Sequence, residues 1–243
     1  GFIWIGTIID GVYRFDGKTL QRYLGPDHKI AGSNIPCIFE DSKGNLWFAD
    51  NGRGVHRYDK ERNTITSYSH DPKNSNSISS NSFYWSGRQV IVEDKFGEIW
   101  IGTYGGGLNR LDQKTGSIKR YQHDPNDSTS LSNNGIRSIF LDSGGNLWIG
   151  TEKGLNLFDD KSETFSHYFP DKKNPNSISG KVVSSIMESK DKNLWFGTEN
   201  QGLNRFDQEQ KAFTRYHYTA RQSKHRDVQP IYAIYEDEIN NFW

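Results

Sequence analysis

The stretch Asn146-Leu147-Trp148-Ile149-Gly150-Thr151 recurs with small changes along the whole chain of 243 residues. Two other versions are Glu98-Ile99-Trp100-Ile101-Gly102-Thr103 and Asn193-Leu194-Trp195-Phe196-Gly197-Thr198. The central tryptophan occurs six times, with spacings of 43, 53, 48, 47 and 48 residues, at Trp4, Trp47, Trp100, Trp148, Trp195 and Trp243. Repeats of this length indicate an architecture in which each period forms one structural unit. Six tryptophans therefore bound five periods.

Each period holds four strand-like phrases, which around Trp148 are 136–141, 147–151, 155–158 and 164–168. The second phrase is apolar at consecutive positions, as expected for a strand covered on both faces. The links within a period are short turns, such as 142–145 and 152–154, and these permit only antiparallel hairpins. A longer link, such as 123–132, leads to the next period. Four-stranded meanders joined by one longer crossover are the blades of a β-propeller.

We therefore predict an all-β fold, a β-propeller of four-stranded antiparallel blades. Its five repeats form either a five-bladed ring or part of a larger one. The prediction is a single propeller segment over residues 1–243, with approximate blades at 1–24, 33–70, 78–124, 132–169 and 178–218. Residues 229–237 form a first-strand phrase that could complete the first blade. Because the closing Asn241-Phe242-Trp243 repeats the opening instead of completing it, we expect an excerpt of a longer array.

The composition excludes several function classes. Thirty basic residues balance thirty acidic ones, whereas nucleic-acid binding needs a basic surface. No apolar run approaches the roughly 18 residues of a membrane-spanning helix, so we expect no membrane insertion by this segment. The single cysteine, Cys37, excludes an internal disulfide and a multi-cysteine zinc site. No histidine or cysteine spacing indicates a metal site, and we expect no cofactor.

A turn of recurring chemistry precedes each tryptophan. Six residues before it stands an aspartate in four of five cases, with Ser189 in the fifth. Three residues before it stands a glycine or asparagine, which tolerates positive φ, except at Lys192. We expect Lys192 to be strained or to adopt a different turn.

The combined phrase 139–151, followed by Gly154-Leu155, resembles the two-component regulator propeller repeat. The resemblance covers the whole chain in five copies. It implies the periplasmic sensor region of a Bacteroides-type hybrid histidine kinase, often two seven-bladed propellers before an immunoglobulin-like module, a membrane helix and cytoplasmic kinase domains. It also implies a glycan signal. The expected partners are an oligosaccharide, the rest of the parent protein and a second copy in a homodimer; any kinase activity would lie in parent domains outside this chain.

Internal repetition separates structural residues from candidate ligand contacts. Residues that recur in every blade are expected to serve the blade. Arginines stand two residues before aspartates in four blades, as in Arg110 and Asp112, and we expect structural pairing or hydrogen bonding there. In the blade of Asp159 the arginine is replaced by Leu157, so Asp159 is expected to find another partner. His70 and His123 occupy equivalent crossovers, where turn formation is the expected role.

One insertion of about five residues falls around 81–88 and contains Trp85, the only tryptophan off the repeat. Tyr84 and Trp85 could stack on a pyranose ring, while Arg88 could bind carboxylate or sulfate. The alternative is that the two rings plug the channel or cover a blade edge. Four residues on the same expected face are secondary ligand-binding candidates: Arg53, Tyr104, Lys153 and Asn200.

Three function hypotheses follow. The first is a non-enzymatic extracytoplasmic sensor, plausibly for glycans. The second is a propeller enzyme of lyase or glycosidase type, using His56 or acids from separate blades at the channel mouth, namely Asp50, Glu152 and Glu199. These acids are equally typical of solvated turns, and no nucleophile motif is present, so we expect no catalytic residue. The third is a purely structural or dimerisation role.

Overall fold

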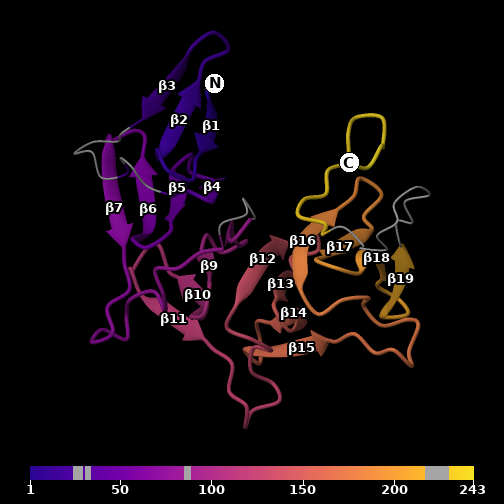
Figure 1. Cartoon of the computed structure of the whole chain (residues 1–243). Helices are drawn as coiled ribbons and strands as arrows, with labels where there is room; N and C mark the ends of the chain where they lie inside the picture. The colour runs from indigo at the N-terminus through magenta and orange to yellow at the C-terminus, as the bar shows by residue number, and fades with distance from the viewer. Residues whose placement is uncertain (24–29, 31–33, 85–88, 217–229) are drawn as a thin grey trace. The chain divides into compact units, whose positions relative to one another are not determined.

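The computed structural model describes residues 1–23, 30, 34–84, 89–216 and 230–243. These residues form 19 β-strands joined by turns and crossovers (Figure 1). The described part of the chain contains no helix long and apolar enough to cross a membrane. The all-β prediction is confirmed.

The chain forms two compact units, and the first spans Gly1–Tyr121. It holds three antiparallel sheets, in which every strand pairs with its sequence neighbours. The first sheet has three strands: β1 (Ile3–Gly6), β2 (Val12–Phe15) and β3 (Leu20–Tyr23). The second has four: β4 (Cys37–Glu40), β5 (Leu46–Asp50), β6 (Gly54–Asp59) and β7 (Thr64–Tyr68). The third is formed by β8 (Ile91–Glu93), β9 (Ile99–Thr103), β10 (Gly107–Leu111) and β11 (Ile118–Tyr121).

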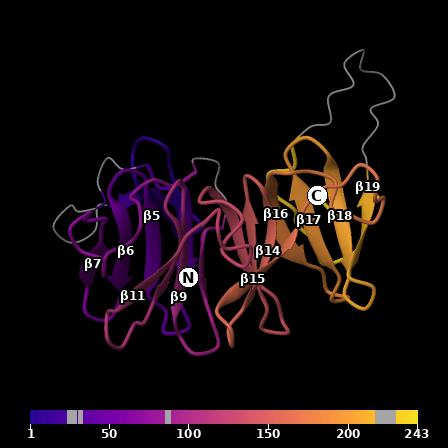
Figure 2. The same cartoon turned by 90° about the horizontal axis from the view of Figure 1, so that it is seen from below.

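The second unit spans Gln122–Trp243 and holds two four-stranded sheets (Figure 2). One consists of β12 (Ile136–Leu141), β13 (Leu147–Thr151), β14 (Gly154–Asp159) and β15 (Thr164–Tyr168). The other consists of β16 (Val183–Glu188), β17 (Leu194–Thr198), β18 (Gly202–Asp207) and β19 (Ala212–Tyr216). Residues 230–243 then begin a further hairpin, with a bridge between Glu236 and Phe242.

Successive sheets pack through their first strands. In the first unit β4 lies against β1 and β8, and in the second β12 lies against β16. Gly150 shows how closely they approach, because a Cβ there would lie 2.4 Å from the carbonyl oxygen of Val183 in β16. The recurring glycine of the repeat therefore leaves room for the inner strand of the next sheet. The sheets are blades of a β-propeller, as predicted.

The turn before each tryptophan also anchors the indole ring. Asp142 accepts hydrogen bonds from the backbone N–H of Asn146 and, at 2.9 Å, from Nε1 of the buried Trp148. At Trp195 the acceptor is the hydroxyl of Ser189, at 3.2 Å. Lys192 has a φ of 66°, and its N–H donates to the carbonyl of Ser189 just as the N–H of Gly145 donates to the carbonyl of Asp142. The turn is therefore unchanged, and the predicted strain at Lys192 is confirmed.

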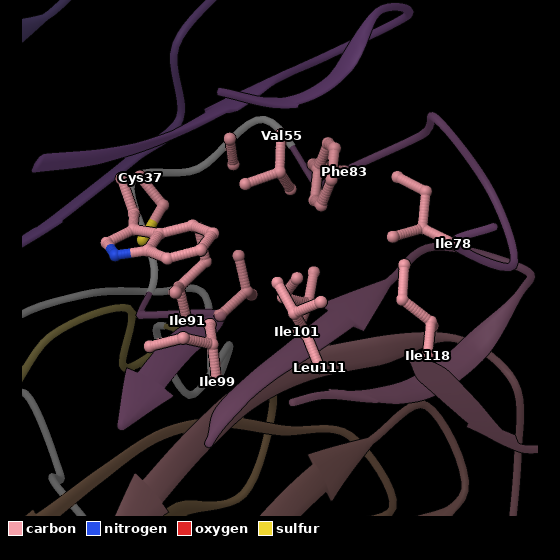
Figure 3. Close-up of a cluster of buried hydrophobic side chains, with 12 residues drawn as sticks. Cys37, Val55, Ile78, Phe83, Ile91, Ile99, Ile101, Leu111 and Ile118 are labelled. Atoms are coloured by element: carbon pink, nitrogen blue, oxygen red, sulfur yellow. The ribbon is translucent and has the colours of Figure 1, made fainter. Parts of the chain in front are cut away.

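Aromatic rings supply much of the core. In each sheet the repeat tryptophan packs against the repeat tyrosine, as Trp100 does on Tyr121 with ring centroids 5.7 Å apart. Figure 3 shows the cluster between the sheets β4–β7 and β8–β11, to which the crossover contributes Ile78 and Phe83. Cys37 lies in this cluster as a buried free thiol, and burial raises its pKa.

The recurring arginines and aspartates serve the blade, as expected, but each has its own partner. Arg110 lies over the ring of Trp100, 5.1 Å from its centroid, and pairs with Glu98. Asp112 instead caps its own hairpin by accepting from Lys114 and Thr115. Asp159 makes the same kind of cap, with the N–H of Lys161.

Candidate functional site

The crossovers and the loops between second and third strands meet at one end of each blade. Backbone N–H groups in these loops donate to crossover carbonyls: Tyr104 to Ser82 at 2.8 Å, Glu152 to Gly135 at 3.1 Å, and Glu199 to Val182 at 3.1 Å. We call this end of a blade the loop face. The candidate ligand-binding residues that the structure describes lie on it.

A repeated hydrogen-bond framework anchors three crossovers, those into β8, β12 and β16, to the blade that follows. In the blade β12–β15, the N–H of Ser132 donates to Asn156 at 2.9 Å, and its hydroxyl pairs with Thr151 at 3.0 Å. His167 of β15 contacts the carbonyl of Ser130 at 2.7 Å. Ser79 and Ser179 bond in the same way to equivalent residues, with Arg120 and Arg215 in the place of His167.

A second device, here called the latch, closes two of these crossovers on themselves. The N–H of His123 donates to the side-chain oxygen of Asn134 at 2.7 Å, and His123 Nδ1 contacts the carbonyl of Leu131 at 2.8 Å. His70 makes the same contacts with Asn81 and Ile78. The turn-forming role predicted for both histidines is confirmed.

The described part of the insertion, residues 81–84, contacts two blades of the first unit. The N–H of the buried Phe83 donates to Asn51 Oδ1 at 2.9 Å. The ring of the half-buried Tyr84 lies 5.9 Å from that of Tyr104, which is 41% exposed. The structure thus brings together two of the sequence-predicted residues. Trp85 and Arg88 lie outside the described residues.

The remaining predicted residues lie on loops of the same kind but on separate blades. Arg53 is exposed, and its carbonyl accepts from Ser69 at 2.7 Å. Lys153 is exposed on the loop between β13 and β14. Asn200 is exposed and lines a cleft of about 510 Å³ between the crossover into β16 and the loop after β17.

Arg137 is a buried charged residue that the sequence analysis missed. It lies in β12, and its guanidinium contacts Glu152 at 2.7 Å and Glu199 at 3.2 Å. It thereby joins the loops of two neighbouring blades. A signal was available, because the equivalent inner-strand positions hold Pro36, Gln89, Ser184 and Tyr232. Glu152 and Glu199, which the enzymatic alternative would bring together, do lie close, but around the shared Arg137 guanidinium.

Asp50 and His56 form a second buried pair in the blade β4–β7. His56 Nε2 lies 3.1 Å from Asp50 Oδ2, and His56 Nδ1 lies 2.8 Å from the hydroxyl of Ser67. Asp50, His56 and Ser67 occupy the positions that Thr151, Asn156 and His167 hold in the framework of the blade β12–β15. Both members of the pair are almost fully buried, at 1% and 4% exposure. In this blade the framework residues bond to one another.

Within the described part of the chain, no group of three or more His, Cys, Asp or Glu side chains lies close enough together to hold a metal ion.

The family of two component regulator propellers matches this chain over residues 29–52, 74–105, 130–153 and 177–200. Each match contains the first and second strands of one blade and the start of the loop that follows them. These repeats are two-component regulator propeller repeats. This is the family that the phrase around Trp148 resembles, and the predicted repeat is confirmed for these four segments.

One curated protein is similar to this chain in sequence. The chain is 33% identical over 157 residues to histidine kinase P4 of Formosa agariphila, which takes in 63% of this chain and 11% of the kinase. The aligned part of this chain thus spans about a tenth of that relative's length.

Solved structures support the propeller fold. PorZ of the Porphyromonas gingivalis type-IX secretion system matches 97% of this chain and 35% of its own length, at 20% identity and a TM-score of 0.69. Virginiamycin B lyase of Staphylococcus aureus matches 96% of this chain and 70% of its own length, at 18% identity and a TM-score of 0.65. The extracellular domain of a protein assigned as a hybrid two component system of B. thetaiotaomicron matches 100% of this chain and 37% of its own length. The two share 24% identity, and the TM-score is 0.51. At these identities the likeness concerns the fold alone.

Proposed function

We propose that this chain is a non-catalytic, periplasmic ligand-recognition propeller of a two-component signalling protein, and that its signal is an oligosaccharide. The observation that carries the proposal is the set of four matched two-component regulator propeller repeats. Kinase activity then belongs to other domains of the parent protein. That parent protein and a second copy of it are the proposed protein partners.

The proposed ligand contacts that the structure describes lie on the loop faces of their own blades. Tyr84, Trp85 and Arg88 belong to the single insertion, and Tyr104 packs beside Tyr84 with an exposed edge. A partly exposed aromatic pair suits the apolar face of a sugar ring, because such rings bury a large area with little loss of side-chain entropy. Arg53, Lys153 and Asn200 are the secondary contacts.

The enzymatic alternative has less support. A glycosidase needs two carboxyl groups that are free to act as acid and base or nucleophile. Glu152 and Glu199 instead share the guanidinium of Arg137. Asp50 and His56 are buried against each other, which keeps a substrate away from them.

A glycan array probed with the chain and with its Tyr84→Ala and Tyr104→Ala variants tests the proposal. We expect wild-type binding to at least one class of oligosaccharide and a loss of about tenfold or more in each variant, since truncating a central aromatic contact at a hot spot costs about 2 kcal/mol or more. Phe96→Ala is the matched control, because Phe96 is exposed on the turn between β8 and β9, at the opposite end of the blade. Absence of binding to all oligosaccharides would reject the oligosaccharide signal.

A further inference from the structure

The crossover from β15 to β16 lacks the latch. Alignment through the repeat places Pro170 where His70 and His123 stand, and Lys181 where Asn81 and Asn134 stand. Proline has no N–H to donate, and the lysine ammonium has no lone pair to accept a hydrogen bond. Both halves of the latch are therefore lost together in this crossover.

A cleft opens at this place. It has a volume of about 510 Å³ and is lined by both substituted residues together with Lys172, Glu199, Asn200 and Gln201. The volume falls within the range of roughly 300–1,000 Å³ that is typical of small-molecule sites. The crossover remains anchored beside the cleft, because Arg215, which also lines it, donates to the carbonyls of Asn174 and Ser177 at 2.9 and 2.8 Å. The cleft is thus a local feature of an otherwise regular blade.

The substitutions also change the charge of the cleft. Lys172 stands where the other two crossovers have Pro72 and Pro125, so this crossover gains two lysines at positions that carry no charge elsewhere. Both lysines are exposed, and neither forms an ion pair within the described part of the chain.

The acids of the cleft are already engaged. Glu199 contacts the guanidinium of Arg137 at 3.2 Å. Asp171 caps its own turn by accepting from the N–H of Lys173 at 2.8 Å. Two lysine ammonium groups and the amides of Asn200 and Gln201 are thus the groups of the lining that remain to meet a ligand.

We propose that this cleft binds an anionic ligand whose carboxylate or sulfate group contacts Lys172 and Lys181. Asn200 and Gln201 bond to neighbouring hydroxyl groups of the ligand. Arg137 is a positioning residue, because it holds Glu199 at the wall of the cleft. The identification of the ligand as a sugar rests on the proposed function, whereas the preference for an anion rests on this crossover alone.

Calorimetric titration of the chain with three disaccharides tests the charge preference. The probes are digalacturonate, a sulfated galactobiose that carries no carboxylate, and neutral galactobiose. We expect at least one acidic probe to bind about tenfold or more tightly than galactobiose, and added salt to weaken it because exposed charges are screened. The stronger of the two acidic probes identifies carboxylate or sulfate as the ligand group. If neither acidic probe binds more tightly than galactobiose, the inference is wrong.

Variants locate the site. The double variant Lys172→Met/Lys181→Met should bind the acidic probe about tenfold or more weakly than wild type, since it removes both cations. Lys161→Met is the matched control, because Lys161 is exposed on the turn between β14 and β15 and outside the cleft. Equal weakening in both variants would indicate non-specific attraction and overturn the proposal.

The double variant Pro170→His/Lys181→Asn rebuilds the latch. We expect it to lose the acidic probe while its Tm stays equal to wild type or rises, because the new hydrogen bonds close the crossover. Unchanged binding in a folded variant would contradict the proposal. If instead this variant fails to fold, the lysine double variant still decides. Neutral oligosaccharides that bind through Tyr84 and Tyr104 would leave the sensor proposal intact in either case.

Discussion

At the scale of single residues, the aspartate before each tryptophan has two roles. The turn role of Asp142 follows from sequence, because aspartate caps tight turns with its own side chain. Its second role, as acceptor for the indole N–H of Trp148, depends on the direction of the ring and so was not predicted. A buried indole N–H without a partner costs about 1–3 kcal/mol. This explains why the replacement at position 189 is serine, which keeps an acceptor.

Lys192→Gly is expected to stabilise the protein. Lys192 has a φ of 66°, and the left-handed region costs a residue with a side chain about 1–2 kcal/mol. Glycine removes that cost but adds freedom to the unfolded chain, so we expect a net gain of about 1 kcal/mol in the free energy of unfolding. Urea denaturation measures it. Gly145→Lys, at the equivalent position with a φ of 82°, should lower the free energy by a similar amount. Identical curves for both variants would contradict the argument.

At the scale of elements, the packing of one blade on the next depends on the repeat glycine. Gly150→Ala should destabilise the protein by about 1–3 kcal/mol, the usual cost of overpacking, because the added methyl would meet the Val183 carbonyl at 2.4 Å. The chain offers a matched control in Ala49, which occupies the same position in β5. Ala49→Gly should change the free energy of unfolding by less than the reverse change at Gly150. Thermal and urea denaturation compare the two, and a neutral Gly150→Ala would refute close approach as the reason for this glycine.

The elements show what the sequence could reveal. The tryptophan period, the short turns and the aspartates predicted four-stranded blades, because these features are local and repeat. The role of Arg137 was not predictable in the same way, because its partners Glu152 and Glu199 come from loops of two blades. The cleft was missed for a similar reason. Pro170 and Lys181 are ordinary surface residues until the latch of the other crossovers is known.

At the scale of the whole molecule, aspartates that cap turns recur from one end of the chain to the other. Hydrogen bonds from the backbone N–H groups of Thr19 and Lys18 lower the pKa of Asp16 to about 2. At Asp237 the N–H of Asn241 and the indole of Trp243 also lower the pKa to about 2. Burial acts to raise the pKa of Asp41, but hydrogen bonds from Trp47 and Asn45 outweigh it and lower the pKa on balance. These groups favour the folded state only while they are ionised.

The stability of the molecule should therefore fall at acid pH. Each of these carboxyl groups has a lower pKa in the folded than in the unfolded chain, where aspartate has its ordinary value of 3.8. Their contribution is complete above that value and is lost as the pH falls through the folded pKa, because the unfolded chain then binds more protons. We expect the free energy of unfolding, measured by urea denaturation, to decline from about pH 4 towards about pH 2.

Asp41→Asn tests whether the capping aspartates cause this decline. The variant keeps an oxygen that can accept from Trp47 but cannot ionise, so it should be less stable than wild type near neutral pH and lose less stability between about pH 4 and about pH 2. Glu61→Gln, at an exposed position in the turn between β6 and β7, should follow the wild-type curve. If Asp41→Asn and wild type decline in parallel, Asp41 does not couple protonation to unfolding. The acid sensitivity would then have to arise elsewhere than in the turns that hold the tryptophans.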